Sequence, residues 1–70
     1  SVARKVDRLI NMGAILIEVP IALLNKASNE ERDAIRRVCR ANNVTLQATS
    51  GSHVVGTVHH PEKGWIRIRI

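Results

Sequence analysis

The last six residues of the chain alternate strictly between two kinds of side chain. Every second residue of the segment 65–70 is isoleucine, and the others are Trp65, Arg67 and Arg69. Successive side chains of a β-strand point to opposite faces of a sheet, so this segment is predicted to be a strand with one covered and one open face. Such a strand needs neighbouring strands and a covering layer, which excludes a purely helical fold.

Three earlier segments also have the character of strands. Residues 14–19 are apolar and rich in branched side chains, and Pro20 ends them. Residues 44–49 and 54–58 each alternate, and a Ser-Gly-Ser turn lies between them. The segment 61–64, Pro-Glu-Lys-Gly, predicts a four-residue hairpin connection to the last strand.

Two amphipathic helices are predicted. The first runs from Val2 to about Met12, where apolar residues recur at helical spacing and Gly13 follows in the position of a C-cap. The second begins at Ser28, which is the N-cap of a capping box with Glu31.

The charge order of the second helix supports its assignment. Its first turn is acidic and its later turns carry arginine, which matches the helix dipole. Asn42 and Asn43 can end it in a left-handed turn. Residues 21–27 leave two interpretations open, a short helical turn or an irregular connection.

These elements predict an α+β fold in the order α-β-α-β-β-β. We expect two helices packed on one face of a small, mostly antiparallel sheet of three or four strands. Seventy residues are enough for one domain, which spans 1–70.

The single cysteine, Cys39, bears on the compartment because it allows no intramolecular disulfide. A lone thiol fits a reducing environment, so we expect an intracellular protein, cytoplasmic or nuclear. No apolar run approaches the roughly 20 residues that span a bilayer, and no membrane partner is expected. The first residue is serine rather than methionine, which indicates a processed form or a part of a larger protein or complex. We expect a monomer.

The charge balance is strongly basic. Eleven lysines and arginines against six acids give a net charge of +5 and an isoelectric point near 10.8. Eight of the eleven are arginine, which suits bidentate phosphate contacts and stacking on bases better than lysine does. Basic domains are attracted to phosphate backbones, so the composition favours a protein that binds nucleic acid. The alternative is a soluble protein whose net charge only keeps its molecules from associating.

A row of arginines on the second helix is the first candidate binding site. Its members follow one another at i, i+4 and i+8, with a fourth arginine beside them: Arg32, Arg36, Arg40 and Arg37. No glutamate stands four residues before Arg40 to neutralise it. The row therefore predicts a track for phosphates, and the alternative is a solvated helix face.

The open side of the last strand is the second candidate. Trp65 is the only Phe, Tyr or Trp in the chain, and it shares this side with Arg67 and Arg69. Either it caps the sheet edge, or it presents a ring on which an unpaired base stacks, a contact worth about 1–3 kcal/mol. His59 and Lys63, beside and within the hairpin turn, are added as contacts to an anionic ligand.

No motif for catalysis or metal binding is present. The spacing of His53, His59, His60 and Cys39 matches no zinc site, and neighbouring strand residues such as His59 and His60 point to opposite faces. The chain contains no nucleophile elbow, zincin motif or phosphate-binding glycine loop. We therefore expect a protein that is not an enzyme and holds no cofactor or metal.

The stretch from Glu31 to Val44 resembles the core of the R-three-H domain, a family named for an arginine and a histidine separated by three residues. In that family a strand that ends in an apolar residue and a proline precedes the helix that carries this motif. A short connection after the helix, a Ser-Gly turn and a final strand follow. The matching features here are Ile17-Glu18-Val19-Pro20, Arg32, Asn43-Val44, Ser50-Gly51 and the strand 66–70, preceded by the helix 2–12. The resemblance spans nearly the whole chain.

The resemblance implies sequence-tolerant binding of single-stranded DNA or RNA, with Arg32 as the signature arginine. Arg36 occupies the position of the family's histidine, so any role that needs an imidazole is lost. The segments 21–27 and 50–64 are also longer than in the family.

The leading prediction is a module that binds single-stranded nucleic acid through its arginines. The alternative is a protein-interaction or assembly domain that pairs through its last strand, if that strand is a sheet edge. The choice between DNA and RNA depends on contacts to a 2′-hydroxyl and stays open.

Overall fold

The computed structural model describes all of residues 1–70 and confirms the α+β class. The helices are α1 (Val2–Asn11), α2 (Ile21–Lys26) and α3 (Asn29–Ala41), and the strands are β1 (Leu16–Pro20), β2 (Thr45–Thr49), β3 (Val55–His60) and β4 (Gly64–Arg69). Of the two interpretations of 21–27, the short helix is correct and covers 21–26, so the fold has a third helix beside the two amphipathic ones.

The sheet has the strand order β2-β1-β3-β4. β1 and β2 are parallel, whereas β1 pairs with β3, and β3 with β4, in antiparallel fashion. The crossover between the parallel strands contains α2 and α3, because parallel neighbours need a long connection. The sheet is therefore mostly antiparallel, as predicted, and its two edges are β2 and β4.

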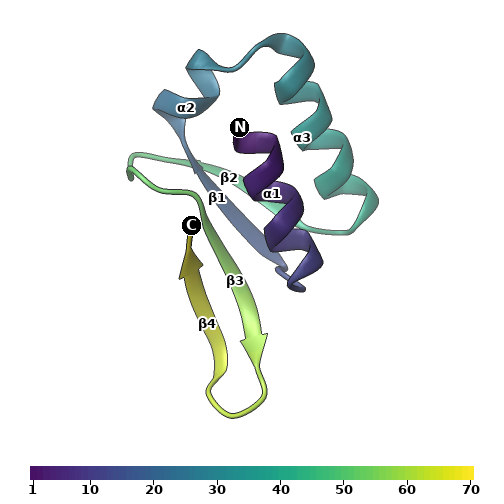
Figure 1. Ribbon diagram of the computed structural model, residues 1–70, viewed down its shortest axis with the longest axis vertical. Helices are drawn as coiled ribbons and strands as arrows, with labels where there is room; N and C mark the ends of the chain where they lie inside the picture. Colours follow the sequence, from purple (N-terminus) through teal and green to yellow (C-terminus); the bar gives the residue numbers. More distant parts are fainter.

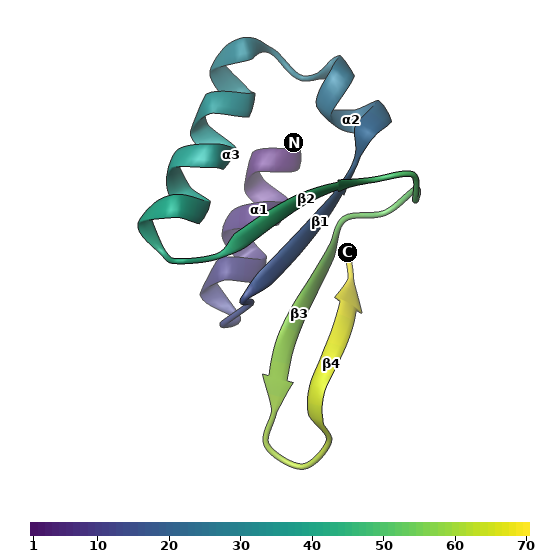
Figure 2. The same ribbon diagram turned by 180° about the vertical axis from the view of Figure 1, so that it is seen from behind.

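All three helices lie on one side of the sheet (Figure 1). The view from behind shows the other face of the sheet free of helices, and in both views the β3–β4 hairpin extends past the helical layer (Figure 2). The strand register places Ile17, Leu46 and Gly56 side by side on the helix face. The core between the two layers consists of Val6, Leu9, Ala14, Ile17, Val19, Ile35, Cys39, Val44, Val54 and Val58.

α1 approaches the sheet closely at Gly56 on β3. A methyl group at this position would lie 2.6 Å from one terminal carbon of Leu9, which is fully buried. Real side chains do not pack that closely, so the absence of a side chain at Gly56 is what lets α1 rest on the sheet.

The ends of the helices follow the sequence signals with one exception. Gly13 has φ 89° after α1, and Asn43 has φ 55° after α3, so both take the left-handed conformation expected of a helix end. The Ser28 hydroxyl accepts a hydrogen bond from the Glu31 N–H at 3.0 Å, as predicted for the N-cap.

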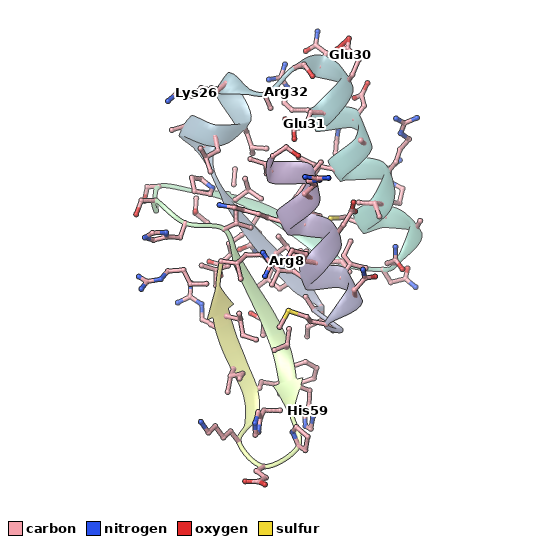
Figure 3. The ribbon with its side chains drawn as sticks, in the orientation of Figure 1. Arg8, Lys26, Glu30, Glu31, Arg32 and His59 are labelled. Atoms are coloured by element: carbon pink, nitrogen blue, oxygen red, sulfur yellow. The ribbon has the colours of Figure 1, made fainter.

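The other half of the predicted capping box is wrong. The Glu31 carboxylate accepts a hydrogen bond from the backbone N–H of Ala3, at 3.0 Å, and no bond from the N–H of Ser28 is present. Figure 3 shows Glu31 directed from the first turn of α3 toward the start of α1. The carboxylate thereby satisfies one of the unpaired donors in the first turn of α1 and joins the two helices.

No helix in the structure combines the length and the apolar character that crossing a bilayer requires.

Candidate nucleic-acid interface

The helix-free side of the sheet, called here the open face, carries the second group of predicted residues. The register pairs Trp65 with His59, and Arg67 with Thr57, so these side chains share one face. The isoleucines of 65–70 point to the other side, toward the core, as the alternation of this segment predicts. The strand residues on the open face are Leu16, Glu18, Thr45, Gln47, Thr49, Val55, Thr57, His59, Trp65, Arg67 and Arg69, whereas Pro20, at the end of β1, is fully buried.

Trp65 is exposed on this face. Its exposed fraction is 56%, the largest of any large apolar residue, so it is not a core anchor. The ring of His59 meets it edge-on, with 5.2 Å between the centroids. This edge-on packing holds the indole next to the hairpin, while much of its surface stays free to contact another flat ring.

Two arginines continue the row that Trp65 begins on β4. Arg67 donates a hydrogen bond from Nη2 to Oε2 of Glu18 at 3.0 Å, and its own side chain is 65% exposed. Arg69 is exposed and forms no ion pair. Lys63 is exposed in the hairpin turn at the end of the same hairpin. Trp65, Arg67 and Arg69 therefore share the open face with His59.

Glu18 is the residue of this face that the sequence prediction missed. It lies on the central strand β1, its side chain is 18% exposed, and it is the only carboxylate among the strand residues of the open face. The residues 14–19 alternate too weakly for its side of the strand to be assigned from the sequence. Its effect is to neutralise part of the charge of Arg67.

His60 has a structural role on the opposite side of β3 from His59. Its Nδ1 accepts hydrogen bonds from the backbone N–H groups of Glu62 and Lys63, both at 3.1 Å. These bonds shape the turn that ends at Gly64, where φ is 77°. The two adjacent histidines therefore diverge, as predicted, and the structure contains no group of three or more His, Cys, Asp or Glu side chains suited to a metal ion.

The arginine row of α3 lies on the helix side of the sheet and does not join the open face. Along this row, Arg36 and Arg40 line the groove between α3 and the edge strand β2. Arg37 projects from the outer surface of α3 beside them. The two predicted groups of residues are thus separate surfaces, on opposite sides of the sheet.

Arg32, the signature arginine of the resemblance, is engaged within the fold. Its Nη1 donates hydrogen bonds to the carbonyl oxygens of Leu24 and Ala27, at 2.7 and 2.8 Å, and its Nη2 donates to Oδ1 of Asn29. The guanidinium lies between α2 and the start of α3 (Figure 3). It satisfies carbonyl groups at the end of α2, so the structure gives Arg32 a role in the helix junction.

The other arginines of the row keep more of their positive charge, because only Arg36 pairs with a carboxylate. Arg36 donates to Oδ1 of Asp33 at 2.8 Å, and this hydrogen bond lowers the pKa of Asp33. Arg37 and Arg40 are exposed and form no ion pair. The α3 surface therefore keeps a net positive charge.

No protein-family model, curated protein or solved structure matches this chain. The likeness to the R-three-H domain therefore stays a prediction from the residues.

Proposed function

We propose that the protein binds single-stranded nucleic acid, DNA or RNA, through the open face, with little sequence preference. The observation that carries the proposal is the exposure of Trp65 in one row with Arg67 and Arg69 on the helix-free side of the sheet. A flat ring beside guanidinium groups combines the two contacts that single strands need, which are stacking on a base and neutralisation of phosphates.

Each of the five residues predicted for this surface and its hairpin turn has a part in the proposal. Trp65 stacks on one base, and His59 supports the ring from the neighbouring strand. Arg67, Arg69 and Lys63 contact phosphates on either side of the stacked base. Stacking and phosphate contacts tolerate any base, so weak sequence preference is expected.

Intrinsic fluorescence tests the proposal, because Trp65 is the only tryptophan in the chain. Titration with an unlabelled oligothymidylate at low salt is expected to quench the emission, since the base covers the indole. Repeating the titration at a fourfold higher salt concentration should weaken the affinity steeply, as counterion release requires. An emission that the oligonucleotide leaves unchanged at low salt, together with no binding by sedimentation, contradicts the proposal.

Assembly through β4 is the second candidate function. β4 lies at the edge of the sheet, and an edge strand has backbone groups free to pair with another strand. Sedimentation distinguishes the two candidates: self-association that salt does not weaken, in a protein that ignores the oligonucleotide, favours assembly.

A further inference from the structure

The other edge of the sheet borders a groove that the open-face proposal does not use. This groove, called here the α3–β2 groove, has an apolar floor and a charged rim. Val44, Leu46 and Ala48 line its floor, and Arg36 and Arg40 line its rim. The arginines stand one helical turn apart, so their positive charges lie on the same side of α3.

The edge of β2 beside this groove is open. The Thr45 N–H donates to the Ile15 carbonyl at 3.0 Å, which directs the backbone groups of Thr45 toward β1. Backbone groups alternate in direction along a strand, so those of Leu46 and Ala48 face the free edge. β2 contains no charged residue and no proline, the usual means by which an edge strand is protected from pairing.

The chemistry of the groove selects among possible occupants. A nucleic-acid strand would need aromatic platforms, and no aromatic side chain lines the groove. A second copy of the chain, paired edge to edge through β2, would bring Arg36 and Arg40 against the same arginines. An extended peptide with carboxylate side chains meets neither obstacle, because its backbone pairs with β2 and its acids face the rim.

We propose that the α3–β2 groove binds an extended, acidic segment of a partner protein, which adds to the sheet as a strand next to β2. Side chains on one side of that strand lie beside Leu46 and Ala48, on the face that carries the rim. Carboxylates there pair with Arg36 and with Arg40, which has no ion-pair partner within the chain. Specificity comes from acidic residues at alternate positions, and the backbone pairing supplies affinity.

The probe for this proposal is a fluorescein-labelled peptide of eight residues in which glutamate and valine alternate. Fluorescence anisotropy is expected to show saturable binding, and the same peptide with lysine in place of glutamate is expected not to bind. Arg40→Glu should weaken binding roughly tenfold or more, because it places a carboxylate opposite the peptide's acids. The matched control is Arg37→Glu, which makes the same charge change on the neighbouring surface of α3, at a residue that does not line the groove.

A second variant tests the strand pairing itself. Ala48→Pro removes one outward N–H and leaves the bonds of β2 to β1 intact, so it should abolish peptide binding while both arginines remain. Circular dichroism and a thermal melt establish that each variant is folded. If Ala48→Pro is unfolded, N-methylation of alternate peptide residues tests the same pairing on the wild-type protein and should also abolish binding.

Three outcomes overturn the proposal. Equal losses in Arg40→Glu and Arg37→Glu would indicate a charge effect without a site. Displacement of the peptide by an oligonucleotide whose own binding Arg40→Glu abolishes would assign the groove to nucleic acid. A dimer that Ala48→Pro dissociates, in a protein that binds no peptide, would assign it to a second copy. None of these depends on Trp65, so failure here is distinct from failure of the open-face proposal.

Discussion

The ring of His59 on β3 meets the ring of Trp65 on β4 at an interplanar angle of 81°, with 5.2 Å between their centroids. The two residues are direct partners in the antiparallel register. Edge-to-face pairs of aromatic rings add about 0.5–1.5 kcal/mol beyond the burial of their surface. An exposed tryptophan is therefore held in place by its cross-strand neighbour, which lowers the entropy lost when a ligand stacks on it.

Trp65→Ala is expected to weaken binding of a labelled single-stranded oligonucleotide by about 1–3 kcal/mol, the contribution of one base stacked on an aromatic ring. The free energy of unfolding should fall by only about 0.5–1.5 kcal/mol, the contribution of the ring pair with His59, because Trp65 lies outside the core. Fluorescence anisotropy gives the affinity, and urea denaturation gives the stability. Met12→Ala is the comparison, since Met12 is similarly exposed, at 48%, but lies at the end of α1. Equal affinity losses in the two variants would remove Trp65 from the interface.

Glu18→Gln should strengthen oligonucleotide binding severalfold. The substitution removes the only carboxylate among the strand residues of the open face and leaves Arg67 free to contact a phosphate. Affinity measured across a salt series should also fall more steeply with salt than for the wild type. Glu30→Gln makes the same charge change at the exposed start of α3 and should have a smaller effect. If both variants strengthen binding equally, net charge rather than the Glu18–Arg67 pair sets the affinity.

Side-chain alternation and the residues at helix ends are sufficient to predict most of the fold. The alternation of 65–70 correctly predicts which side of β4 is covered, because strand parity needs no tertiary information. Ser28 and Gly13 mark helix ends through the conformations that those residue types favour. In contrast, α2 has only six residues and no side-chain hydrogen bond at its N-cap, so it is too short for helical periodicity to distinguish it from a loop.

The separation of the two basic surfaces could not be predicted from the sequence. It depends on the strand order and on which side of α3 faces α1. The hydrogen bond between the Ala3 N–H and the Glu31 carboxylate is one contact that orients α3 against α1. Arg32 illustrates the same limit. Its spacing places it in a row with Arg36, but its guanidinium is taken up by carbonyl groups of α2, a helix that the sequence leaves undecided.

Gly56→Ala is expected to destabilise the protein by about 1–3 kcal/mol, the usual cost of overpacking a core. The added methyl group would lie 2.6, 3.0 and 3.1 Å from three carbons of Leu9, a fully buried side chain that would have to shift within the core. Urea denaturation measures the change. Gly51→Ala is the matched substitution, because a methyl group there meets nothing closer than 3.6 Å and the backbone has no positive φ. A Gly56→Ala protein as stable as Gly51→Ala would mean that α1 does not rest on the sheet as described.

Cys39 is expected to react slowly with thiol reagents while the protein is folded. Burial, assisted by the negative charge of Asp7, raises the pKa of the Cys39 thiol, and the thiolate is the reactive species. At pH 8 a disulfide reagent should therefore label the folded protein at least roughly tenfold more slowly than the chain unfolded in urea. Equal rates would show that the thiol is accessible and that Cys39 lies outside the core.

The same shift predicts that stability falls at alkaline pH. The folded thiol binds its proton more tightly than the unfolded thiol, so above about pH 8.5, the ordinary thiol pKa, the unfolded chain has lost protons that the folded chain retains. Fewer protons bound in the unfolded state make the free energy of unfolding decrease as pH rises. Urea denaturation at a series of pH values measures this slope, and Cys39→Ala should flatten it even though the smaller side chain lowers stability at every pH. A slope that persists unchanged in Cys39→Ala would show that the Cys39 thiol is not its source.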